Sequence, residues 1–187
     1  MVGRIVIEAV RPVVDCGQWP ARAVAGQRIT VKATVFRDGH DIIGAGVRLR
    51  GPGGVTVFEP MRPGEPGTDR WSAEVTIPAE GLWDYVIEAW TDPIATWRRN
   101  TAKKLEAGQD VALELEEGAR LMEAAARGVP AASKQALLDA AAAMRAEGPH
   151  AHRYAAGLRP EVTQLVSGHP VRHLLTRSPR QRMFDKG

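Results

Sequence analysis

The sequence predicts an antiparallel β-sandwich of immunoglobulin-like type, followed by a small α-helical domain. Residues 1–107 alternate between apolar and polar side chains with a period of two, which is typical of strands with one buried face. Residues 108–177 instead space their apolar side chains as helices do, and all five tryptophans precede them. We therefore expect a sandwich over 1–107, a helical bundle domain over 108–177 and a flexible tail over 178–187.

The strand pattern is clearest in three runs, at residues 29–35, 47–49 and 71–77. Each run is bounded by residues that favour turns, in the segments "RDGHD", "RGPGG", "RPGEPGTD" and "PAEG". Short alternating strands separated by such turns are characteristic of two antiparallel sheets packed face to face.

The helical pattern begins in "DVALELEEGARLMEAAARG", with Asp110 as the expected N-cap and Gly128 as the expected stop. Its apolar stripe comprises Val111, Leu115, Gly118, Met122 and Ala125. A second helix is expected in "ASKQALLDAAAAMRAEG", and two short helices near 150–157 and 160–167. The apolar residues of the second helix are Leu137, Leu138, Ala141 and Met144.

Three tryptophans lie within "GLWDYVIEAWTDPIATWRRN", residues 81–100. In a straight strand Trp83 shares a face with apolar neighbours, so we expect it in the core. Trp90 falls on the opposite face, beside Glu88, and Trp97 follows a break at Asp92-Pro93. These two indoles are candidates either for stacking on α-glucan sugars or for packing against another part of a protein, and we favour packing.

Composition excludes several functional classes. The net charge of +3 is too small to indicate nucleic-acid binding, and no apolar run reaches the ~18 residues of a membrane helix. The single cysteine, Cys16, rules out an intrachain disulfide and a four-cysteine zinc site. The N-terminus lacks the features of a signal peptide. We expect a cytoplasmic protein without nucleic-acid or membrane partners.

No motif in the chain indicates a metal or cofactor. The histidine pairs His150/His152 and His169/His173 have no obvious carboxylate as a third ligand, and Pro170 interrupts the second pair. The glycine-rich segments lack the lysine and the strand-to-helix setting of a phosphate loop. We expect no metal and no cofactor.

Four segments resemble the N-terminal region of the α-1,4-glucan:maltose-1-phosphate maltosyltransferases, from about Gly3 to Ser178. They are "RPVVDCGQWPARAVAGQRITVKATVFRDGHDIIGA", "GLWDYVIEAWTDPIATWRRN", "LEEGARLMEAAARGVP" and "LRPEVTQLVSGHPVRHLLTRS". In that family this region forms an immunoglobulin-like domain and a helical domain, which precede a glycoside-hydrolase-type barrel. The barrel carries the catalytic carboxylates that transfer a maltosyl unit from maltose 1-phosphate to α-glucan.

The resemblance implies a non-catalytic domain that docks to that barrel and forms a homodimer. A barrel takes about 250 residues, so no catalytic residue of the family transfers to this chain. The family also returns a strand to the sandwich, for which "RSPRQRMFDKG" offers no obvious counterpart, so we expect an incomplete sandwich. For the dimer surface we expect a second apolar flank at Leu113 and Leu121, aided by the small residues 140–143.

Overall fold

The computed structural model describes residues 4–12 and 24–182. The chain divides into two compact units: unit 1 comprises Met1–Thr91 and Leu174–Gly187, and unit 2 comprises Asp92–His173. Cys16 and the Pro20-Ala21 segment lie outside the described residues.

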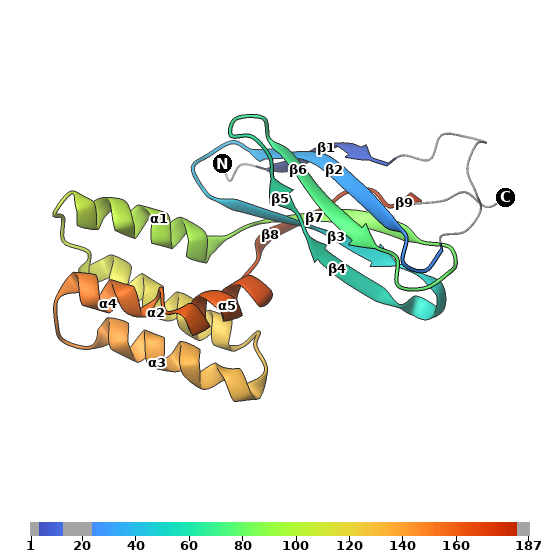
Figure 1. Cartoon of the computed structure of the whole chain (residues 1–187). Coiled ribbons are helices and arrows are strands. Elements are labelled where there is room, and N and C mark those ends of the chain that lie inside the picture. Colours follow the sequence, from blue (N-terminus) through green and yellow to red (C-terminus); the bar gives the residue numbers. More distant parts are fainter. Residues whose placement is uncertain (1–3, 13–23, 183–187) are drawn as a thin grey trace. The chain divides into compact units, whose positions relative to one another are not determined.

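Unit 1 contains, within the described residues, two antiparallel sheets. Their orders are β1-β2-β6-β5 and β4-β3-β7-β8, and β9 also pairs with β7 (Figure 1). The strands are β1 (Ile5–Arg11), β2 (Arg28–Arg37), β3 (Ile43–Arg50), β4 (Thr56–Pro60), β5 (Arg62–Pro63), β6 (Arg70–Thr76), β7 (Asp84–Thr91), β8 (His173–Arg177) and β9 (Gln181–Arg182). A short 3-10 turn, Pro52–Gly54, precedes β4.

The core of unit 1 is formed by inward-facing side chains of both sheets. The alternation of β2 places Val31 and Val35 in this core at 0% exposure, with Lys32 between them in solvent. Trp83 is 2% exposed, so its expected place in the core is confirmed. The two packed sheets are compatible with a sandwich, while the immunoglobulin-like topology stays a prediction.

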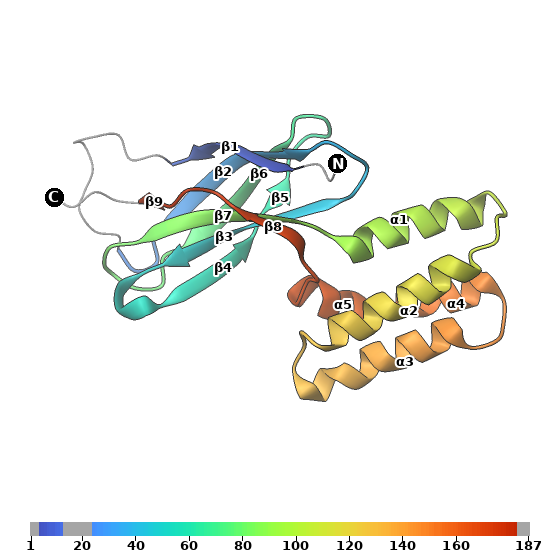
Figure 2. The ribbon, with the colours of Figure 1, turned by 180° about the vertical axis from the view of Figure 1, so that it is seen from behind.

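The sandwich does receive a returning strand, and the expectation that it would not is wrong. After the helices, β8 and β9 run beside β7 (Figure 2). In β9, Gln181 pairs with Tyr85 and Arg182 with Asp84, so the segment expected as a tail from 178 belongs in part to the sheet. Its sequence, rich in arginine and interrupted by Pro179, lacks the alternation that identifies a strand. The sheet positions it because the edge of β7 needs partners.

Unit 2 consists of helices. They are α1 (Pro93–Glu106), α2 (Ala112–Ala126), α3 (Lys134–Arg145), α4 (His150–Ala156) and α5 (Pro160–Gly168), with a 3-10 turn at Ala131–Ser133. The last four correspond to the expected helices. Helix α1 was not expected, although Asp92-Pro93 is a typical helix start: the Asp92 Oδ1 accepts the Ala95 N–H at 3.0 Å and proline occupies the first turn. The unit boundary consequently falls at Asp92, not at the expected residue 107.

We predict that Ser178→Ala destabilises the chain by about 1–3 kcal/mol, because the buried N–H of Ile87 would lose its acceptor. That N–H donates to the Ser178 Oγ at 2.8 Å, and Ile87 is fully buried. Thr176→Ala is the matched control on the preceding strand, since its hydroxyl bonds only the exposed Leu174 carbonyl among the interactions of the described chain. Urea unfolding of both variants measures the difference. Equal midpoints for the two variants would contradict this role of Ser178.

Candidate functional site

Trp97 is the central side chain of unit 2. It projects from α1 and is 3% exposed. Its Nε1 donates to the Glu114 carbonyl of α2 at 2.6 Å, and its ring centroid lies 5.5 Å from that of Tyr154 in α4. One indole therefore joins three helices through packing and a hydrogen bond, and satisfies its only polar atom within the fold.

Two glycines make room for this indole. A Cβ atom at Gly118 of α2 would lie 2.2 Å from the Trp97 Cζ2, far inside contact distance. At Gly157, just after α4, it would lie 3.1 Å from the Trp97 ring and 2.6 Å from the Met144 Cε. The sequence pattern placed Gly118 on the buried stripe of its helix but gave no indication of its partner. The glycine and Trp97 are brought together only by the fold of α1 onto α2.

Trp90 is also buried, at 5% exposure, on the face of β7 away from the sandwich core. Its ring packs on Gly44 of β3, where a Cβ would lie 2.7 Å from the indole, and its centroid is 6.1 Å from that of Phe58. The guanidinium of Arg48 lies over the Phe58 ring at 5.1 Å. Both candidate tryptophans thus lie against protein, which favours packing over sugar stacking.

Glu88 precedes Trp90 by two residues on the same face and is 1% exposed. A carboxylate at that depth requires paired charge. Arg48 of β3 donates to its Oε1, and the Arg177 Nε from the end of β8 lies 3.7 Å from the same oxygen. This carboxylate therefore joins β3, β7 and the returning strand.

The two residues of the expected apolar flank on α2 differ in exposure. Leu113 is 83% exposed, whereas Leu121 is half-buried and packs against the helical core. Of the small residues at 140–143, Ala140 and Ala141 are buried within unit 2. Of the four candidate residues Trp90, Trp97, Leu113 and Leu121, all within the described chain, Leu113 is the most exposed and Leu121 is only partly exposed.

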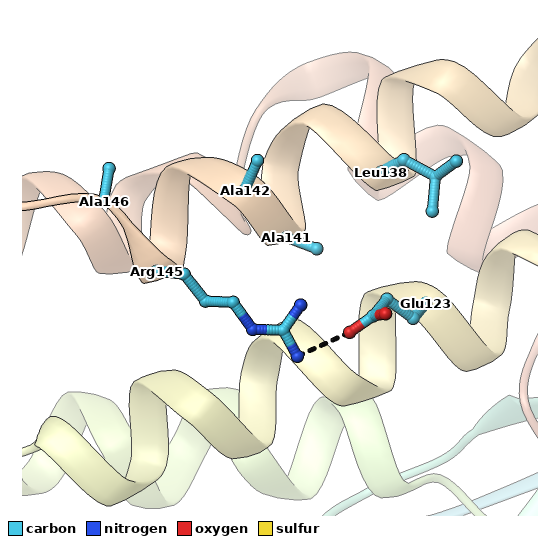
Figure 3. Close-up of a pocket in the computed structure, with 6 residues that line it drawn as sticks. All are labelled: Glu123, Leu138, Ala141, Ala142, Arg145 and Ala146. Atoms are coloured by element: carbon cyan, nitrogen blue, oxygen red, sulfur yellow. Dashed lines mark ion pairs between the residues drawn. The ribbon is translucent and has the colours of Figure 1, made fainter.

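An open groove of about 390 Å³ lies between α2 and α3 (Figure 3). It is lined by Glu123, Leu138, Ala141, Ala142, Arg145 and Ala146. In Figure 3 the Arg145 side chain reaches towards Glu123, and its Nη2 lies 2.6 Å from the Glu123 Oε1. The two charged side chains of the lining form an ion pair with each other, and the remaining lining side chains are all apolar.

Two carboxylates of α2, those of Glu114 and Glu116, have a lowered pKa and are held ionised. Hydrogen bonds from Arg145, and then from Arg120, keep the pKa of Glu116 down at about 2. A hydrogen bond from Lys104 is the main cause that lowers the pKa of Glu114. A general acid that works near neutral pH needs a raised pKa, so these groups are suited to structural ion pairs and not to proton donation.

The described residues show neither a metal-binding cluster nor a helix that could span a membrane. Among them, no three His, Cys, Asp or Glu side chains are grouped so that they could hold a metal ion. Within the same residues, no helix combines the length and apolar character needed to cross a membrane.

We predict that Gly118→Ala destabilises the chain by about 1–3 kcal/mol, because the added methyl group overpacks against Trp97. Helix propensity alone predicts the opposite sign, since alanine is about 1 kcal/mol more favourable than glycine within a helix. Gly168→Ala in α5 is the control, as a Cβ there meets nothing within 4 Å. Thermal unfolding measures both, and a stabilised Gly118→Ala variant would contradict the close packing of the indole.

We predict that Arg145→Gln raises the pKa of Glu116 from about 2 towards its ordinary 4.5. Because the folded-state pKa is depressed, the ion pair stabilises the chain above about pH 4.5 and that stability is lost as the pH falls towards 2. The variant should therefore lose less stability between pH 5 and pH 3 than the native chain. Carboxyl NMR titration and urea unfolding measure both effects at low salt, where exposed charges are least screened. Arg127→Gln, in an exposed residue, should match the native profile; an unchanged profile for Arg145→Gln would refute the pairing.

The sequence of this chain matches a known protein family. Residues 3–184 match the family described as α-1,4-glucan:maltose-1-phosphate maltosyltransferase, domain N/S. The chain is 50% identical over 181 residues to α-1,4-glucan:maltose-1-phosphate maltosyltransferase 1 of Streptomyces coelicolor, covering 95% of this chain and 27% of the relative. It is 38% identical over 207 residues to the enzyme of that name from Mycolicibacterium smegmatis, covering 95% and 30%.

The Myxococcus xanthus protein of the same name is 37% identical over 182 residues, with coverage of 94% of this chain and 27% of the relative. The chain thus spans little more than a quarter of the length of these relatives. The resemblance drawn from the sequence is confirmed, and it extends past Ser178 through the returning strand. The chain belongs to the α-1,4-glucan:maltose-1-phosphate maltosyltransferase family, in the part of it described as domain N/S.

Proposed function

We propose that this chain is a non-catalytic accessory region of a cytoplasmic α-1,4-glucan:maltose-1-phosphate maltosyltransferase. In this proposal it docks to a glycoside-hydrolase-type catalytic barrel and pairs with a second copy of itself. The observation that carries the proposal is the match to domain N/S over residues 3–184, which occupies 27% of the length of the Streptomyces coelicolor relative. Most of that relative's length lies outside the matched region.

The chemistry of the acidic side chains supports a structural role. Glu88 is buried between arginines of β3 and β8, and Glu116 is bound by Arg145 and Arg120. Maltosyl transfer through a glycosyl-enzyme requires one carboxylate that stays nucleophilic and one carboxyl group that donates a proton. The Arg145 guanidinium lowers the pKa of Glu116 and donates to both of its carboxylate oxygens.

Pairing between copies is supported most directly by Leu113. A leucine exposed over 83% of its surface at the start of α2 gains from burial against another protein surface, and two-fold pairing is the commonest such arrangement. Leu121 packs partly within its own unit, so the proposed surface centres on the first turns of α2 and not on the whole expected flank.

Binding of α-glucan is the alternative role, and the burial of both candidate tryptophans weighs against it. A sugar platform uses aromatic rings that are open to solvent, whereas Trp90 and Trp97 are 5% and 3% exposed. The two indoles also lie in different units, so they are not two members of one platform within either unit.

We predict that the chain alone releases no phosphate from maltose 1-phosphate in the presence of glycogen. The physical reason is that Glu88, Glu114 and Glu116 already form ion pairs with arginine or lysine side chains of the same chain. A phosphate-release assay against a heat-denatured control measures this, and turnover above the control would overturn the non-catalytic assignment. Native gels that contain glycogen test the alternative, because retardation of the chain would favour a glucan-binding role.

We predict that the chain forms a weak dimer and that Leu113→Glu shifts it towards monomer, because the new charge would be buried at the interface. Sedimentation equilibrium over a wide concentration range measures the association. Leu158→Glu is the matched control, in an exposed leucine of the loop between α4 and α5. A mass near 20.3 kDa at the highest concentration would exclude pairing, and a dimer equally stable in Leu113→Glu would exclude this surface.

A further inference from the structure

The outer face of the sheet β4-β3-β7-β8 carries four arginines, which we call the arginine group. On β3 they alternate with the buried Val47 and Leu49, which places them on the face away from the core. Two further members belong to the returning segment, at the end of β8 and three residues later. The members are Arg48, Arg50, Arg177 and Arg180.

Two carboxylates of β7 lie among these arginines. The side chain of Glu88 is 1% exposed and that of Asp84 is 27% exposed, whereas the side chain of Arg177 is 61% exposed. The carboxylates therefore lie deeper than the guanidinium groups, and four positive charges stand against two negative ones. The surface that the group presents to solvent is consequently positive, which favours an anionic ligand.

Arg48 and Arg177 each approach Glu88 through a single nitrogen. The Arg48 Nε donates to the Glu88 Oε1, and the Arg177 Nε lies 3.7 Å from the same oxygen. Because both nitrogens lie near one oxygen, the two guanidinium groups are neighbours. Arg145 differs, since its Nε and Nη2 donate to both oxygens of Glu116. Among the described residues, the terminal nitrogens of Arg48 and Arg177 form no hydrogen bond, so a ligand can use them.

Both guanidinium groups are held in position from the protein side. The Arg48 Cζ lies over the Phe58 ring, 5.1 Å from its centroid. Arg177 precedes Ser178, whose N–H donates to the Ile87 carbonyl and fixes this part of the chain against β7. An arginine that is anchored at its Nε, with its terminal nitrogens free, loses little further freedom when it binds an oxyanion.

The number of donors and the charge favour phosphate over carboxylate. A carboxylate has two oxygens, which a single guanidinium fork can occupy. A phosphate ester carries a charge of about −1.5 to −2 at pH 7 and three acceptor oxygens, so it can bridge two forks. Its charge also matches the excess of positive over negative charge in the arginine group and its two carboxylates.

We propose that Arg48 and Arg177 form a phosphate-binding site, in which their terminal nitrogens bind one phosphate group above the buried Glu88. Arg50 and Arg180 add positive charge at its border. Inorganic phosphate and phosphate monoesters share the chemistry that this site recognises. The inference is independent of the proposed docking and pairing, because it concerns side chains within unit 1 alone.

The test titrates the isotope-labelled full chain with inorganic phosphate and follows the arginine Nε–H signals by NMR at constant ionic strength. We expect the signals of Arg48 and Arg177 to shift saturably, with a Kd of about 1 mM for a partly exposed site of charge-assisted hydrogen bonds. The signal of Arg28, an exposed arginine that pairs with Glu74 on the other sheet, should stay unchanged. Sodium acetate at the same ionic strength should shift none of the three signals.

Arg177→Gln removes one fork and leaves Arg48 as a partner for Glu88, and circular dichroism checks that the variant folds. The affinity for phosphate should fall at least about tenfold. Arg177→Lys keeps the charge but not the planar fork, so it should recover only a small part of the loss. Arg28→Gln is the matched control and should bind phosphate as the native chain does.

A second titration, with glucose 1-phosphate, identifies the source of the phosphate. An affinity equal to or below that for inorganic phosphate assigns the site to the free ion, and a higher affinity assigns it to a monoester with further contacts. The proposal would be overturned by the absence of a saturable shift at Arg48 and Arg177, by an equal shift at Arg28, or by full recovery of binding in Arg177→Lys.

Discussion

The architecture of unit 1 depends on satisfying both edges of a strand that is buried on both faces. Ile87, Glu88 and Ala89 of β7 are at most 1% exposed. Water cannot serve their backbone groups at that depth, so each edge needs a hydrogen-bonding partner. Strand β3 supplies one edge and the returning segment supplies the other. The chain must therefore come back to β7 after the helices, and unit 2 is an insertion between two strands of one sheet.

The core of the helical unit contains many small side chains, mostly alanines, together with the large side chain of Trp97. Alanine-rich helices approach one another closely but leave little to fill the space where a third helix crosses. Trp97 fills that space, and Gly118 and Gly157 open the cavity that receives it. The fit explains why glycine is present within α2 despite its cost in helix stability. An indole in this position serves packing, which accounts for one of the tryptophans concentrated within residues 81–100.

The sequence was most informative where periodicity was strong. The strand alternation at residues 29–35 and the stripe from Val111 to Ala125 predicted both their structure and their buried side chains. It failed where a single contact across the fold decides the structure. Helix α1 has its signal in the Asp92 cap and Pro93, which can equally mark a strand end. The returning segment, residues 174–182, has no periodic signal, because its place is set by the contacts of Ser178 and its flanking arginines with β7. Leu121 is half-buried whereas Leu113 is exposed, a difference that one helix pattern cannot show because it does not tell which flank its neighbours cover.

The chain belongs to the maltosyltransferase family, and the returning segment, residues 174–182, links its two units a second time. Amide hydrogen exchange at Ile87 tests this account most directly. If residues 174–182 are an integral part of the sheet, the Ile87 N–H should exchange only through global unfolding, with the same free energy as the core amides of β2. Exchange at Ile87 through a local opening of low free energy, while β2 stays protected, would contradict the dependence of the sandwich on its returning strand.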